Sequence, residues 1–145
     1  MVDVSAKEST RRVARASCLV RTSVAPRHES GPTLTPDVIL SARLAGIHAA
    51  KRTAEVIPLC HPLALSSVLL DVEVQDRGFA MTCEVVTDAR TGVEMEALTA
   101  CSFAALVLVD HLVASDPRVR VEDLTLLRKS GGKSGDWGRD VPATH

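Results

Sequence analysis

Alternating apolar and polar residues along four stretches of the chain predict β-strands. In the first stretch, small apolar side chains occupy the even positions from Ala14 to Val20, whereas Arg15 and Arg21 lie on the other face. The turn residues Asp76–Gly78 separate the second stretch from the third, which predicts a hairpin. The four predicted strands are residues 12–24, 68–74, 79–87 and 118–127.

Helical spacing over residues 37–52 predicts a first helix, flanked by two loops. Leu40, Leu44 and Ile47 form one apolar stripe, the pattern with which a helix covers a core, and Pro36 suits the first helical position. Residues 25–36 are rich in Pro, Gly and Ser and predict a loop. Residues 53–63 contain two prolines, which exclude a helix or a central strand and predict an ordered loop.

A second helix is predicted from Thr91 to about Ala114. Thr91 and Glu94 fit a capping box, and the helix is apolar on most faces, so we expect it to be largely buried. The order β-α-β-β-α-β predicts a ferredoxin-like α+β sandwich, with an antiparallel sheet and two helices on one face. We expect one domain over residues 1–145, in which residues 128–145 form a glycine-rich tail.

Composition narrows the functional classes. The chain has 145 residues, of which 46% are hydrophobic and 24% charged, with a net charge of −1 and 2% aromatic residues. These values argue against broad electrostatic binding to nucleic acid and against base-stacking platforms. The N-terminus lacks a hydrophobic signal region, and the longest mainly apolar stretch is shorter than the roughly 20 residues that span a membrane. We therefore expect a soluble cytoplasmic protein without nucleic-acid or membrane partners.

The cysteines give no metal-binding pattern. Cys18, Cys60, Cys83 and Cys101 show no C-x-x-C spacing, and no nearby histidine pattern completes a zinc site. We expect free thiols in a reducing compartment, and neither a metal nor another cofactor.

Acidic residues on the second helix are candidates for acid–base chemistry. Asp110 lies in an almost wholly apolar stretch, where burial would raise the pKa of its carboxyl, unless it lies near the helix end and reaches solvent. Glu94 and Glu96 lie in the first turn, where they also complement the helix dipole. Glu96 and Asp110 are separated by about 21 Å along the helix axis, so a neighbouring subunit would have to unite them in one site.

Two further stretches predict ligand binding. His61 stands between Cys60 and Pro62 in the stiff proline loop, which suits a positioned acid, base or donor, although it is also compatible with an ordinary loop histidine. The stretch 129–135, KSGGKSG, has backbone amides and lysines suited to an anion, although its composition also fits a mobile tail. Lys51 and Arg52 complement a helix C-terminus or form a second anion pocket.

Four motifs together resemble the MoaC family, the cyclic pyranopterin monophosphate synthases of molybdenum-cofactor biosynthesis. The motifs are SARLAGIHAAKRT at 41–53, IPLCHPL at 57–63, TGVEMEALTA at 91–100 and KSGGKSGDW at 129–137, and MVDVSAK at 1–7 adds to them. The resemblance implies a ferredoxin-like fold and a hexamer, a trimer of dimers with sites between subunits. It also implies conversion of 3′,8-cyclo-7,8-dihydro-GTP, a triphosphate, to cyclic pyranopterin monophosphate with release of pyrophosphate.

The resemblance assigns roles by matching position. It implies that Asp110 and Glu94 act in catalysis, with Lys133 as a further catalytic candidate, and that the substrate is bound by Leu59, Cys60, His61, Met95, Glu96, Lys51 and Lys129.

The chain departs from the family at two positions that usually carry lysine, here Thr35 and Val113. One hypothesis is an active synthase in which His111 or Lys133 compensates. The alternative is a catalytically impaired or repurposed paralogue that binds a related nucleotide or pterin, or a non-catalytic subunit.

Overall fold

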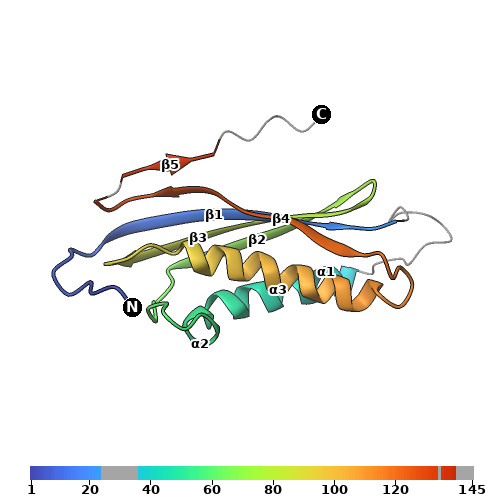
Figure 1. Ribbon diagram of the computed structural model, residues 1–145, viewed down its shortest axis with the longest axis horizontal. Coiled ribbons are helices and arrows are strands. Elements are labelled where there is room, and N and C mark those ends of the chain that lie inside the picture. The colour runs from blue at the N-terminus through green and yellow to red at the C-terminus, as the bar shows by residue number, and fades with distance from the viewer. Residues whose placement is uncertain (24–35, 134, 140–145) are drawn as a thin grey trace.

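A computed structural model describes residues 1–23, 36–133 and 135–139 (Figure 1). Most of the loop predicted at residues 25–36, including Thr35, lies outside these ranges, as do residues 140–145 of the predicted tail. The elements in chain order are β1 Thr10–Arg21, α1 Pro36–Ala50, α2 Thr53–Val56, β2 Ser67–Gln75, β3 Gly78–Ala89, α3 Glu94–Leu112, β4 Arg120–Ser130 and β5 Trp137–Gly138.

The strands form one antiparallel sheet in the order β2-β3-β1-β4-β5. The first four strands have the arrangement of a ferredoxin-like α+β fold, which confirms the prediction. The short β5 was not predicted; it pairs Trp137 with Lys129 and adds an edge strand beyond β4. Consequently, the stretch predicted as a tail from residue 128 begins inside β4.

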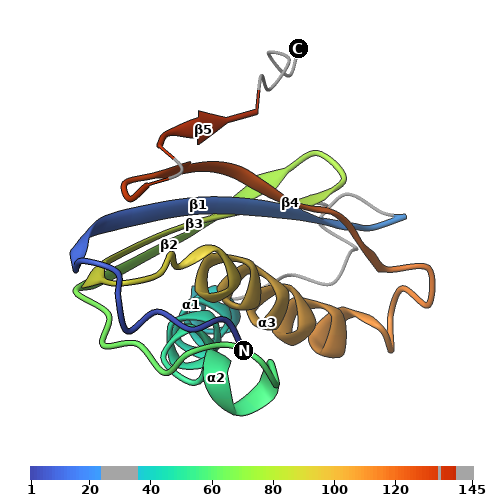
Figure 2. The ribbon, with the colours of Figure 1, turned by 60° about the vertical axis from the view of Figure 1, so that its left-hand side comes forward.

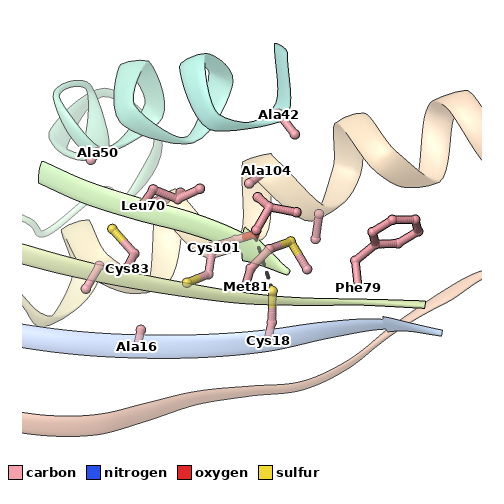
Figure 3. Packing of buried hydrophobic residues seen from close by; sticks show 14 of the residues in the cluster. Ala16, Cys18, Ala42, Ala50, Leu70, Phe79, Met81, Cys83, Cys101 and Ala104 are labelled. Atoms are coloured by element: carbon pink, nitrogen blue, oxygen red, sulfur yellow. Dashed lines mark hydrogen bonds between the residues drawn. The ribbon is translucent and has the colours of Figure 1, made fainter. Parts of the chain in front are cut away.

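The helices α1 and α3 cover one face of the sheet, and α2 lies at one end of this helix layer (Figures 1 and 2). The even positions of β1 from Ala14 to Val20 are buried, as the alternation predicts. Three core thiols, Cys18, Cys83 and Cys101, gather between the sheet and α3, and the Cys18 thiol donates to the Cys101 carbonyl over 3.4 Å (Figure 3). Burial raises the pKa of Cys83 to about 12, and the contact with the Cys18 thiol together with burial raises the pKa of Cys101.

The core-facing side of α1 differs from the predicted apolar stripe. Leu40 and Leu44 are exposed, whereas the buried positions of this helix are the small residues Ala42, Gly46, Ala49 and Ala50. The reason is the close approach of α1 to α3. A Cβ added at Gly46 would lie 2.5 Å from the side chain of Leu70 and 2.7 Å from the Ala100 carbonyl oxygen, so only small residues fit between the helices.

The start of α3 also differs from the predicted capping box. The helix begins at Glu94 with Val93 as N-cap, and no side chain caps it. Thr91 lies two residues before this N-cap, and the Glu94 carboxylate accepts from Lys129, outside the helix. By length and composition α3 could span a membrane, but half of it is buried inside the fold, so we interpret it as the core helix.

The segment predicted as an ordered loop at residues 53–63 contains the one-turn helix α2. The helix ends at Val56, two residues before Pro58, because a residue that precedes proline avoids helical geometry. The remainder of the segment has no helix or strand, as predicted.

Candidate functional site

The predicted site residues gather where β3 leads into α3. The residues between these elements, from Arg90 to Val93, cross the end of the sheet and place the first turn of α3 against the loop before β2. A pocket forms there, which we call the carboxyl pocket. It is lined by Val2, Leu59, Cys60, His61, Thr91, Gly92, Glu94, Met95 and Glu96.

The carboxyl pocket contains a buried acid whose hydrogen-bonding capacity is only partly used. Glu96 is 2% exposed, and the Cys60 thiol donates to its Oε1 over 3.5 Å. Its Oε2 is buried without a hydrogen-bond partner among the described residues. Burial raises the pKa of the Glu96 carboxyl, and burial together with the charge of Glu96 raises the pKa of Cys60 to about 11. Both groups can therefore hold a proton at a pH at which exposed carboxyls have lost theirs.

A second pocket, the cationic pocket, shares a wall with the first. Thr91, Gly92 and Glu94 line both pockets. The other residues that line the cationic pocket include four basic ones, and they are Lys7, Arg12, Val13, Arg90, Lys129, Ser130 and Gly131. So many cations around one hollow suit a phosphorylated ligand.

Two residues that line the cationic pocket form an ion pair. The Lys129 ammonium donates to Glu94 Oε1 over 3.0 Å, and both side chains are about one-third exposed. The Glu94 carboxylate lies close against Gly92, where a Cβ would overlap it. Glycine at this position therefore allows Glu94 to reach Lys129.

The N-terminal segment runs from β1 toward the start of α3 and α2 (Figure 2). The Arg90 guanidinium donates to the Ser5 carbonyl over 3.2 Å and so ties the segment to the site. The segment contributes Val2 to the carboxyl pocket and Lys7 to the cationic pocket.

Lys51 lies on another side of Glu96. It lines a pocket with Arg52, Glu55 and the loop residue Pro62, and Glu96 forms part of the same wall. The buried carboxyl thus separates two hollows, one of which carries the basic residues at the end of α1.

Neither Asp110 nor Lys133 lines the carboxyl pocket or the cationic pocket. Asp110 is exposed near the C-terminal end of α3, rather than buried as its apolar surroundings suggested. His111 and Val113 are exposed beside it. Lys133 is exposed on the turn after β4 and lines a fourth pocket, which shares Lys7 and Arg12 with the cationic pocket.

Sequence reasoning missed Lys7, Arg12 and Arg90. A signal was present for Arg12, because it has the same parity in the alternation of β1 as the buried Ala14 and Ala16. An arginine on the inward face of a strand indicates either a buried partner or a ligand.

The fold and its pockets define a class of protein: a ferredoxin-like α+β sandwich with a cationic pocket and a buried carboxyl at the start of its core helix. The sequence matches the MoaC family over residues 1–132. The chain belongs to the MoaC family.

Curated relatives are similar over nearly the whole chain. A cyclic pyranopterin monophosphate synthase of Streptomyces coelicolor is 51% identical in an alignment that covers 96% of this chain and 83% of the relative. The protein of the same name from Streptomyces griseus subsp. griseus is 49% identical over 98% of this chain and 81% of its own. Cyclic pyranopterin monophosphate synthase 2 of Mycobacterium tuberculosis is 46% identical over 96% of this chain and 84% of its own.

Proposed function

We propose that this protein is a cyclic pyranopterin monophosphate synthase, a lyase of molybdenum-cofactor biosynthesis that acts on 3′,8-cyclo-7,8-dihydro-GTP and releases pyrophosphate. The observation that carries the proposal is the shared wall between the cationic pocket and the carboxyl pocket. A triphosphate joined to a heterocyclic base needs two such hollows side by side. Identity of about half the residues to synthases favours this function over a repurposed or non-catalytic paralogue.

The cationic pocket would hold the phosphates. Pyrophosphate leaves with more negative charge than it carries in the substrate, and fixed cations lower the free energy of the transition state in which that charge develops. Lys129 is half-buried in the lining of this pocket and already paired with Glu94. An incoming phosphate would take the place of the carboxylate beside the ammonium group.

The carboxyl pocket would hold the base. The free Oε2 of Glu96 can accept a hydrogen bond from an N–H group on the edge of a guanine-derived ring. His61, half-buried opposite, is placed to exchange protons with the ligand. Opening and closing rings requires several proton transfers, and these groups supply them without a cofactor.

Asp110 requires a neighbouring subunit if it acts in this site. About 21 Å of helix separates it from Glu96. We propose a hexamer, a trimer of dimers, in which Asp110 of one chain completes the site of another. The exposed apolar rows on the helix layer support burial by other copies; they are Leu40 and Leu44 on α1, and Phe103 and Leu106 on α3.

The positions Thr35 and Val113 remain departures from the usual family pattern. Val113 is exposed one residue beyond the end of α3, near His111. We propose that His111, or Lys133 of the turn after β4, supplies the cation that lysine would otherwise bring. The free core thiols support a reducing location such as the cytoplasm.

A single-turnover assay tests the proposal. Purified protein is mixed with 3′,8-cyclo-7,8-dihydro-GTP, and both the pyranopterin product and pyrophosphate are quantified. We expect both from the intact protein, neither from Asp110→Ala, and less of both from His111→Ala. A folded, ligand-binding protein that yields no product would contradict the proposed function and support the paralogue.

A further inference from the structure

Arg12 is a buried cation held by backbone groups. Its side chain is on the inner face of β1 and the residue is 9% exposed. Its Nε donates to the Ala89 carbonyl over 3.3 Å and its Nη1 to the Gly131 carbonyl over 3.2 Å. In the described part of the chain, no carboxylate forms an ion pair with it. Burying a charge without an opposite charge is costly, so a compensating role is expected.

The two carbonyls belong to segments that reach the cationic pocket from different strands. Ala89 ends β3 and leads to Arg90, whereas Gly131 follows β4 directly after Lys129 and Ser130. The strand β1 lies between β3 and β4 in the sheet. The Arg12 side chain therefore joins the ends of both flanking strands and fixes the separation of the two segments.

Gly132 makes room for this connection. Its φ is 78°, and a Cβ at this position would overlap Nη1 of Arg12. Gly135, on the same turn, has a φ of 68° but no heavy atom within 4 Å of an added Cβ. Both glycines thus have a left-handed backbone conformation, but of these two only Gly132 lies against Arg12.

We propose that Arg12 is a positioning residue that holds the Gly131–Gly132 turn at a fixed place, so that Lys129 and the turn amides face a bound triphosphate. The consequence for turnover rests on the proposed function. The effect on the turn and on anion binding does not depend on it.

The test compares the affinity for inorganic tripolyphosphate among matched variants. We expect Arg12→Ala and Gly132→Ala each to raise the Kd about tenfold, because each breaks hydrogen bonds to a charged group. Gly135→Ala measures the backbone strain alone, and Arg15→Ala removes the same charge from the outer face of β1. The Kd of Gly132→Ala should exceed the Kd of Gly135→Ala at least about threefold. In the double variant Arg12→Ala/Gly132→Ala, the two effects on the Kd should not be additive.

A second readout separates positioning from simple charge. Trypsin should cut after Lys133 faster in Arg12→Ala, Arg12→Lys and Gly132→Ala than in wild type. In the same variants, the KM for the substrate should rise by a larger factor than kcat falls. If Arg12 acts by charge alone, Arg12→Lys will bind tripolyphosphate as tightly as wild type. In that case Gly132→Ala will bind it as tightly as Gly135→Ala. These two results would overturn the proposal. Absent tripolyphosphate binding by wild type overturns it as well, whereas absent turnover alone refutes only the proposed function.

Discussion

Glu96 is nearly inaccessible in the folded chain, yet half of its carboxyl group has no hydrogen-bond partner among the described residues. A buried, partly unsatisfied acid lowers the stability of the ligand-free protein. The thiol of Cys60 satisfies the other oxygen. This cost in stability is consistent with the role in ligand binding that we propose for Glu96.

Replacement of Glu96 by Gln should therefore stabilise the protein and abolish turnover. Glutamine keeps an oxygen that can accept from Cys60 and removes the buried charge, so we expect the free energy of unfolding at pH 7 to rise by about 1 kcal/mol. Denaturant unfolding measures the change. If Glu96→Gln is less stable than wild type at pH 7 and its oligomeric state is unchanged, the buried carboxylate does not destabilise the protein.

The same substitution should change the pH dependence of stability. The pKa of the Glu96 carboxyl is raised in the folded state above its ordinary value of 4.5. The protonated Glu96 carboxyl therefore makes its full contribution to the free energy of unfolding below pH 4.5. This contribution is lost as the pH rises through the folded-state pKa. The stability difference between Glu96→Gln and wild type should grow as the pH rises from about 4.5. A difference that is constant with pH would contradict the burial argument.

The thiols should react very unevenly. Cys18, Cys83 and Cys101 are inaccessible, and the pKa of Cys60 is raised to about 11. Ellman's reagent at pH 8 should modify at most Cys60 in the native protein, about a hundredfold more slowly than in the unfolded chain, because few thiolates are present. Cys60→Ser should remove this reaction, and all the cysteines should react in denaturant. Rapid modification of two native thiols would contradict the packing of the core.

At the scale of elements, the contact between α1 and α3 depends on Gly46. On an exposed helix, Gly→Ala stabilises by about 1 kcal/mol. At Gly46 the added methyl group would meet Leu70 and Ala100, so we expect Gly46→Ala to destabilise by about 1–3 kcal/mol instead. Ser41→Ala on the exposed side of α1 serves as control. A more stable Gly46→Ala would show that the helices are farther apart.

The strands could be predicted from the sequence because a half-buried strand carries its own pattern. Alternation in β1 from Ala14 to Val20 directly reports which face meets the helices. The face of α1 could not be predicted in the same way. Its leucines give an apolar stripe, but the space beside α3 admits only small residues, and this restriction depends on the partner helix. The partner of Glu94 at the start of α3 could not be predicted either, because Lys129 is distant in sequence.

For the whole molecule, the residues that the motifs singled out lie close together in the carboxyl pocket, although their roles stay a prediction. Leu59, Cys60 and His61 come together with Glu94 and Glu96, although the loop and the helix are more than thirty residues apart in the chain. The cationic pocket was only partly foreseen, because Arg12 reaches it through a strand whose arginines otherwise face solvent.

Assembly should be visible in the size of the particle. The exposed leucines of the helix layer, such as Leu44 at 58% and Leu106 at 53%, indicate a surface for association with other copies, and we proposed a hexamer. Light scattering coupled to size exclusion measures the mass. Leu106→Glu should reduce both the mass and the turnover, whereas Leu69→Glu, exposed on β2, should serve as the comparison for an apolar residue outside the helix layer. A fully active monomer would refute a site completed by the Asp110 of another subunit.

The most direct measurement is a crystal structure of the Asp110→Ala variant soaked with 3′,8-cyclo-7,8-dihydro-GTP. We expect the phosphates in the cationic pocket beside Arg12 and Lys129, the base against Glu96, and position 110 of a neighbouring chain at the ligand. Substrate bound elsewhere, or bound in this place with no second subunit near it, would contradict the account.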